Sequence, residues 1–156
     1  MVALGWFMMS VEDEPGSDWY FAQHKSVGIL VALLVLLRLI WRLANPPAPL
    51  PRSVPTWQAR LATFTQGGLY ALMVLMPLSG YLGASYSEHG VAVFGWPLPA
   101  WAAPDHDRAE QFFDVHGALA WVLVALVAAH VLGSLKHLLK DKDGVFERMW
   151  FETPRD

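Results

Sequence analysis

Three long apolar stretches, at residues 22–43, 61–87 and 113–139, most constrain what this chain can fold into. The second stretch carries no charged side chain, and its most apolar part spans residues 69–84. A helix of about 20 apolar residues crosses the hydrocarbon core of a bilayer and satisfies its own backbone hydrogen bonds. We therefore predict an all-α protein with three complete transmembrane helices.

The composition agrees with a bilayer as solvent. Hydrophobic residues make up 54% of the chain and charged residues only 16%, whereas an ordinary soluble domain has about 25% charged residues. The chain has no cysteine, which excludes disulfides, iron–sulfur clusters and a thiolate ligand to haem. It also has no phosphate-binding loop, no HExxH motif and no basic surface that would bind nucleic acid.

Residues 1–10 are apolar, but they are too short to cross a bilayer and lack the basic region of a signal peptide. We interpret them as the end of a helix that begins upstream of Met1. The predicted fold is therefore a transmembrane four-helix bundle whose first helix is truncated at the N-terminus. Residues 1–156 are expected to form one membrane-embedded domain.

The charges of the connecting segments alternate along the chain. Residues 10–23 and 85–112 are predominantly acidic, whereas residues 38–60 contain no acidic side chain. Cytoplasmic segments of membrane proteins are enriched in Lys and Arg, so we predict that residues 45–55 and the C-terminus are cytoplasmic. The basic residues on which this rests are Arg38, Arg42, Arg52, Arg60, Lys136, Lys140, Lys142, Arg148 and Arg155.

Two histidines, His116 and His130, are the only ionisable residues between positions 115 and 135. At about 100° per residue, their spacing returns to nearly the same helix face roughly 21 Å further along the axis. Two imidazoles so placed, near opposite leaflets, have the spacing needed to hold two haems across a bilayer. An ionisable group deep in a membrane costs free energy and usually has a function. The alternative role of His130 is a hydrogen bond between two helices.

A third histidine, His24, lies at the outer end of the first stretch. We expect His24 and His116 each to open a helix at the same outer depth, where two neutral imidazoles from adjacent helices would bind one iron. Six-coordinate haem iron has no open position for oxygen, which suits electron transfer. The alternative is that both histidines merely lie at the membrane interface, where a histidine side chain costs little free energy.

Two further residues near the inner ends are candidates for contact with a cofactor. Arg38 follows His24 by fourteen residues, so it shares that helix face and would pair with a haem propionate. Its alternative role is a snorkelling side chain at the helix end. His137 is either an alternative inner ligand, a contact of a haem propionate, or an interfacial residue without such a role.

The ordered motifs of this chain resemble the prokaryotic cytochrome b561 family over nearly its whole length. They are HKSVGILVALLVLLRLIWRL at 24–43, the loop PPAPLP, LYALMVLMPLSGYL at 69–82, the loop VFGWPLP, the last helix with His116, His130 and Lys136-His137, and KDKDGVFERM at 140–149.

This resemblance implies a four-helix cytochrome of the bacterial inner membrane, usually with two b haems, that exchanges electrons with the quinone pool. It implies that His24 and His116 hold the outer haem and that His130 is one ligand of the inner haem. Two features depart from the family. Its other inner ligand is a His early in the first helix, upstream of Met1, and Gln66 stands where the family usually has a His.

We therefore expect a haem b protein that passes electrons between an outer-face partner and the quinone pool or an inner-face partner. Quinone oxidoreductase activity remains open, and a second copy of the chain is a candidate partner besides the lipid bilayer. One alternative is a cytochrome b subunit that anchors a hydrogenase or dehydrogenase. An alternative of another class is a non-haem membrane transport or assembly protein that uses its histidines structurally.

Overall fold

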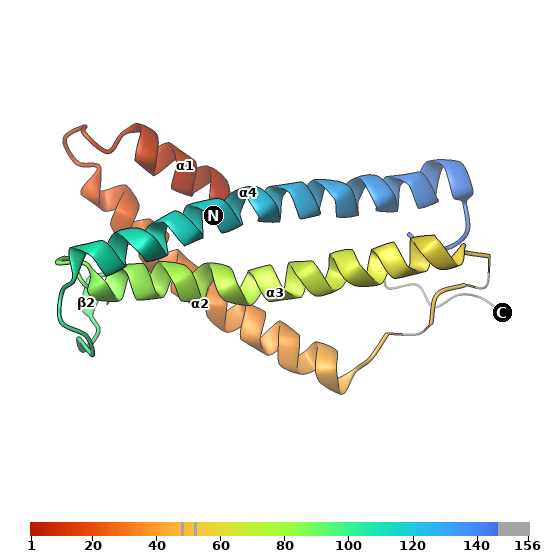
Figure 1. The fold of residues 1–156 in the computed structure, drawn as a ribbon, viewed down its shortest axis with the longest axis horizontal. Helices are drawn as coiled ribbons and strands as arrows, with labels where there is room; N and C mark the ends of the chain where they lie inside the picture. The colour runs from red at the N-terminus through yellow and green to blue at the C-terminus, as the bar shows by residue number, and fades with distance from the viewer. Residues whose placement is uncertain (48, 52, 147–156) are drawn as a thin grey trace.

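The chain folds into a bundle of helices with one short hairpin (Figure 1). The computed structural model describes residues 1–47, 49–51 and 53–146. In chain order the elements are α1 (Val2–Ser10), α2 (Asp18–Ala44), α3 (Thr56–Tyr86), β1 (Ala92–Val93), β2 (Trp96–Pro97), α4 (His106–Lys136) and a π-helical turn, η1 (His137–Asp141).

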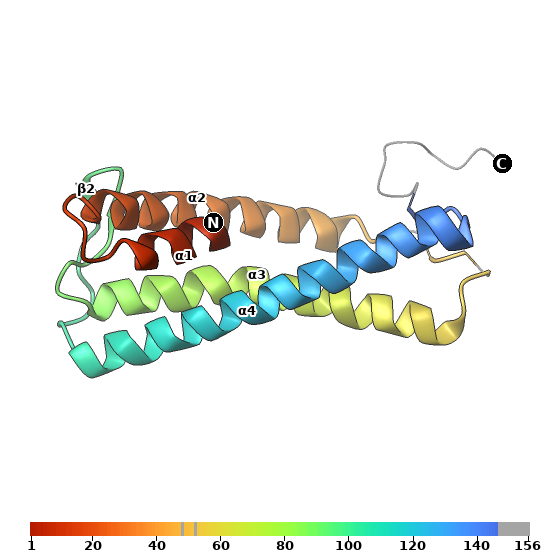
Figure 2. The ribbon, with the colours of Figure 1, turned by 90° about the horizontal axis from the view of Figure 1, so that it is seen from above.

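The long helices α3 and α4 run antiparallel, and α1 and α2 lie together on one side of that pair (Figure 2). Along the bundle, α1 covers only one half, and in the other half α2 diverges from α3 (Figure 1). We call the end with the connecting segments 11–17 and 87–105 the acidic end. The end with residues 45–55 and the segment after Lys136 is the basic end.

The three predicted spans are confirmed, because α2, α3 and α4 with its π-helical turn are each long and apolar enough to cross a membrane. The second of them, α3, continues as a helix through Pro77, which membrane helices tolerate. Residues 2–10 form the helix expected there. The basic residues Arg52, Arg148 and Arg155, with the rest of residues 147–156, lie outside the described residues.

The predicted starts of the first and last complete helices are wrong. α2 begins well before His24, and α4 begins at His106, so His116 lies inside its helix rather than in the first turn. At α4 the cause is a side-chain cap, since Asp105 Oδ1 accepts the N–H of Arg108 at 3.1 Å. Such a cap satisfies a free N–H of the first turn and extends the helix beyond its apolar stretch.

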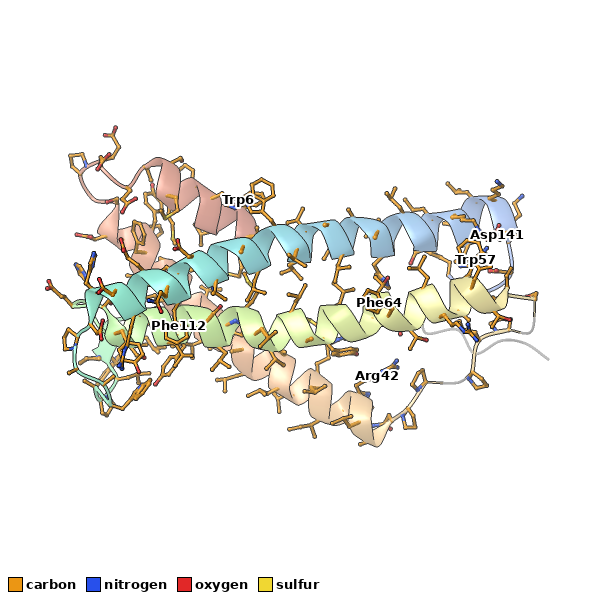
Figure 3. All side chains as sticks on the ribbon, in the orientation of Figure 1. Trp6, Arg42, Trp57, Phe64, Phe112 and Asp141 are labelled. Atoms are coloured by element: carbon orange, nitrogen blue, oxygen red, sulfur yellow. The ribbon has the colours of Figure 1, made fainter. Side chains whose placement is uncertain are left out.

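Small residues lie between the helices and large ones point outward. A Cβ on Gly83 would come within 2.7 Å of the Phe113 ring, and one on Gly68 within 2.9 Å of Leu126 Cδ1. α3 therefore approaches α4 more closely than a larger residue would permit. Phe64, labelled in Figure 3, is 73% exposed. Small residues at helix contacts and large apolar residues outside are typical of helices packed in lipid.

The segment VFGWPLP, which the sequence motifs present as a loop, belongs partly to a β-hairpin. Val93 pairs with Trp96 in an antiparallel ladder, and the turn residues Phe94 and Gly95 have φ of 48° and 87°. Two positive φ values are typical of a type I′ turn, which usually carries Asn or Gly at its first position. The sequence did not indicate the hairpin because Phe94 occupies that position.

Ser26 joins this hairpin to α2. Its side chain is almost fully buried, at 1% exposure. Ser26 Oγ donates to the Ala22 carbonyl at 2.7 Å and accepts the Phe94 N–H at 2.9 Å. The neighbouring Lys25 donates to the Gly90 carbonyl at 3.3 Å. The two contacts hold the hairpin against the part of α2 that carries His24.

Replacing Ser26 by Ala should loosen the hairpin, because the Phe94 N–H loses its acceptor. Loss of a hydrogen bond costs about 0.5–1.5 kcal/mol, so we expect a lower thermal midpoint and faster proteolytic cleavage within residues 90–97. Ser10→Ala is the control, since Ser10 Oγ bonds only the Phe7 carbonyl on an exposed surface. Equal cleavage rates in both variants would contradict the role of Ser26.

Candidate functional site

The structure brings His24 of α2 and His116 of α4 together in the acidic half of the bundle. Their ring centroids lie 6.1 Å apart, with the ring planes at 83°. An imidazole nitrogen binds a transition metal at about 2 Å and its ring centre lies about 1 Å further, so two imidazoles on opposite sides of one metal have centroids roughly 6 Å apart. The observed separation matches that arrangement.

Two residues of α3 fix the ring of His116. Its Nδ1 lies 2.9 Å from the carbonyl oxygen of Met76 and 3.2 Å from Ser79 Oγ. Because a carbonyl oxygen can only accept, Nδ1 carries the proton and donates to Met76, which leaves the Nε2 lone pair free. Histidines that bind metals usually donate their other ring N–H to such a group, so His116 is oriented as a ligand would be.

His24 contains a buried nitrogen that the described residues do not satisfy. Its Nδ1 is inaccessible to solvent and has no hydrogen-bond partner among them. Buried polar atoms without partners are rare, and each costs about 1–3 kcal/mol. His24 is therefore a side chain whose environment suits a further interaction with a bound group.

Two glycines allow the backbone to approach these rings closely. A Cβ on Gly80 of α3 would lie 2.9 Å from His116 Cε1 and 3.0 Å from its Nδ1. A Cβ on Gly5 of α1 would lie 3.2 Å from His24 Cε1. All four α-helices thus contribute to the histidine pair. α2 and α4 each contribute an imidazole, and the backbones of α1 and α3 lie close to these rings.

His130 lies in a separate groove toward the basic end, between α3 and α4. The groove has a cavity volume of about 190 Å³, which is smaller than the roughly 300–1,000 Å³ of most ligand sites. Its lining includes Trp57, Gln66 and the buried Thr65 of α3. The second imidazole in the groove is His137, and no residue of α1 or α2 is among the lining residues that the structure describes.

His137 belongs to a polar cluster, which we call the basic-end cluster: Lys136, His137, Asp141 and Asp143. His137 Nδ1 lies 2.7 Å from Asp143 Oδ2 and 3.4 Å from Asp141 Oδ2. Lys136 pairs with Asp141 and donates to Gln58 Oε1 at 3.3 Å. The possible ligand atoms of the histidine and the two aspartates lie within 4.8 Å of one another, but the ammonium group of Lys136 already neutralises Asp141.

The carboxyl group of Asp143 is held in its charged form. Burial alone would raise its pKa, but hydrogen bonds from His137 and from the Val145 N–H outweigh this effect and lower the pKa below its usual value. Asp143 is therefore a carboxylate that accepts hydrogen bonds through both of its oxygens.

Arg38 is exposed on α2 and does not line the groove that contains His130. It lies near the C-terminal end of α2 (Asp18–Ala44). The structure thus brings together His24 with His116 and His130 with His137, but not Arg38 with either pair.

Residues 1–152 match the family described as prokaryotic cytochrome b561. The chain belongs to this family. Cytochrome b561 homolog 2 of Escherichia coli (strain K12) is 35% identical over 162 aligned positions, which cover 100% of this chain and 84% of the relative. A probable superoxide oxidase, CybB, of Yersinia pestis is 24% identical over 131 positions, covering 84% of this chain and 74% of the relative.

As a member of the cytochrome b561 family, the protein is a multi-pass membrane protein of electron transport, and the family binds haem b. Two features of the structure fit haem between α2 and α4: the spacing of the His24 and His116 rings, and the buried Nδ1 of His24. The family does not support the alternative of a non-haem transport or assembly protein.

Sequence reasoning missed the groups that orient these histidines. Met76 contributes a backbone carbonyl, which no side-chain pattern reveals. Asp143 follows His137 by six residues, a spacing at which helical side chains do not meet. Only the left-handed conformation of Lys142, with φ of 49°, turns the chain so that they do.

Replacing Gly80 by Ala should disturb the haem held near His116, because the new methyl group would lie 2.9 Å from the imidazole. We expect a shifted or weakened haem absorption band and a lower haem-to-protein ratio. Gly67→Ala is the matched control on the same helix, since nothing lies within 4 Å of its Cβ. Identical spectra for the two variants would contradict the role of Gly80.

Proposed function

We propose that the protein passes single electrons across the membrane, between a partner at the acidic end and the quinone pool or another partner at the basic end. The observation that carries this proposal is the His24–His116 pair, whose ring centroids lie 6.1 Å apart, so that both imidazoles could hold one haem. Haem b, when bound, supplies the one-electron redox chemistry of its iron. The chain supplies the ligands, the apolar surroundings and the path between the two ends.

His24 and His116 would hold one haem, and His130 would hold a second in the groove at the basic end. His116 presents Nε2 because Met76 occupies its Nδ1. Among the described residues, no histidine of α1 or α2 lines the groove beside His130. We therefore assign no second protein ligand to this haem. His137 would act toward a bound group through Nε2, since Asp143 holds its Nδ1.

The acidic end would face the outside of the bacterial inner membrane, and the C-terminus would be cytoplasmic. The alternation of acidic and basic connecting segments supports this orientation. Residues 1–156 would act as one unit in the bilayer, since the histidine site draws on all four helices. A homodimer remains part of the proposal.

The name of the Yersinia relative suggests superoxide as one electron donor at the acidic end. The runner-up is a cytochrome b subunit that anchors a larger hydrogenase or dehydrogenase. Co-purification of a large catalytic subunit would favour the anchor. Reduction of the purified protein by enzymatically generated superoxide would support superoxide as the electron donor, provided that superoxide dismutase abolishes it.

Substitution of the histidines tests the haem assignment directly. His24→Ala and His116→Ala should each remove the same haem, because each leaves that iron with a single imidazole. His130→Ala should remove only the other haem. The measurements are the haem-to-protein ratio and the reduced α-band of purified protein, with the exposed His106→Ala as control. Retention of both haems in His116→Ala would refute its ligand role, and a colourless wild-type preparation would refute the whole proposal.

Substitution of Arg38 tests its proposed pairing with a propionate of the second haem. A guanidinium group stabilises the more negative, reduced form of the haem, so Arg38→Gln should lower the midpoint potential of that haem alone. Arg42→Gln, one turn further along the same helix, is the control. Unchanged potentials in a redox titration of Arg38→Gln would show that this side chain merely lies at the helix end.

A further inference from the structure

We propose that Lys25 binds a propionate group of the haem that His24 and His116 hold, and so anchors the polar edge of that haem at the acidic end. This inference rests on the proposed function, because it takes His24 and His116 as the ligands of one haem. It adds a cofactor-binding residue that no sequence motif indicated.

Lys25 directly follows His24 on α2 and is partly buried. A charged side chain within a membrane helix costs free energy and usually has a polar partner or a function. Lys25 Nζ donates to the Gly90 carbonyl at 3.3 Å, which is longer than the usual length of about 2.9–3.0 Å. The neighbouring Ser26 binds the hairpin at 2.9 Å. Since Ser26 makes the shorter of the two contacts, holding the hairpin does not by itself account for a charged residue at position 25.

The positive charge of Lys25 is not neutralised by the residues that the structure describes. An ammonium group has three donors, and its contact with Gly90 uses one of them on a neutral carbonyl oxygen. Asp18, seven residues earlier on α2, attracts the ammonium group electrostatically, but no ion pair joins the two side chains. Because a partly buried charge without a partner is unfavourable, Lys25 is suited to bind an added anion.

Few cations are available at the acidic end. Of the 11 lysine and arginine residues of the chain, only Lys25 and Arg108 belong to this end. Arg108 already has partners, since its Nε lies 3.1 Å from Asp105 Oδ2 and its guanidinium group lies over the ring of Tyr86. Lys25 is therefore the cation of the acidic end that has no carboxylate partner among the described residues.

A haem propionate is the anion that fits this position. Haem b carries two propionate groups on one edge, and carboxylates form strong, charge-assisted hydrogen bonds with cationic donors. The connecting segments of the acidic end are themselves predominantly acidic, so a further carboxylate would be repelled unless a cation lay beside it. Because Lys25 is adjacent to His24, the same turn of α2 would hold the iron through one residue and the polar edge of the haem through the next.

The experiment measures how fast haem leaves the purified holoprotein for an excess of apomyoglobin. The phase of release that belongs to this site is the one that His116→Ala lacks. Lys25→Gln should accelerate this phase about tenfold, because the propionate loses a charge-assisted hydrogen bond. Lys25→Arg keeps the positive charge and should release haem nearly as slowly as the wild type.

The dimethyl ester of haem b, reconstituted into the apoprotein, distinguishes a propionate from any other anion. The ester has no charged propionate, so Lys25→Gln and the wild type should release it at the same rate. Such a cycle isolates the pairwise contribution of two groups. In the wild type the ester should leave at least as fast as native haem leaves Lys25→Gln, a comparison that needs no substitution.

A redox titration gives a second readout. An ammonium group near the haem stabilises the reduced form, which has one more negative charge, so Lys25→Gln should lower the midpoint potential of this haem. Ser26→Ala is the control for the hairpin, since it removes a contact but no charge. Arg108→Gln is the control for charge, since it removes the other cation of the acidic end. Both controls should release haem as slowly as the wild type.

Three outcomes would count against the proposal. Equal release of native haem from Lys25→Gln and the wild type would overturn the role of Lys25 and leave the proposed function intact. An effect of Lys25→Gln that persists with the ester would also overturn it, because Lys25 would then act on the hairpin or on a dissolved anion. A wild-type protein that binds no haem would instead overturn the proposed function itself.

Discussion

The close approach of α3 to α4 is the contact on which the rest of the structure depends. Helices in lipid gain no hydrophobic energy by meeting, so they associate through van der Waals contact and hydrogen bonds. Gly68, Gly80 and Gly83 allow this contact, and each faces a side chain of α4. Gly80 faces His116, so the same close packing that joins the two helices also brings the imidazole to the Met76 carbonyl.

Much of the architecture was predictable, because the bilayer demands a few long apolar helices. The spans and the all-α class follow from three apolar stretches, and the pairing of His24 with His116 follows from their similar depth. The helix starts were not predictable from apolarity, since α4 is extended by a cap at Asp105. The hairpin was missed because Phe94 adopts a conformation that usually belongs to Asn or Gly.

The two halves of the bundle differ in how many helices contribute to each site. In the acidic half, α1 and α2 lie beside α3 and α4, and the hairpin is joined to α2 through Ser26. His24 and His116 are therefore held from several directions. Toward the basic end α2 diverges, and the groove around His130 is lined by α3, α4 and their adjoining segments. The preorganised pair in the acidic half is the better defined of the two sites for a resident cofactor.

His116 and His137 are oriented by acceptors of different kinds. His116 and His137 each have an oxygen acceptor at Nδ1, and each is left with Nε2 for another partner. The acceptor of His116 is the carbonyl oxygen of Met76, an arrangement in which histidine ligands of metals are commonly oriented. The acceptor of His137 is the Asp143 carboxylate, which holds the orientation of the ring. The two imidazoles are thus oriented in the same way, one by a backbone carbonyl from a neighbouring helix and the other by a carboxylate six residues along the chain.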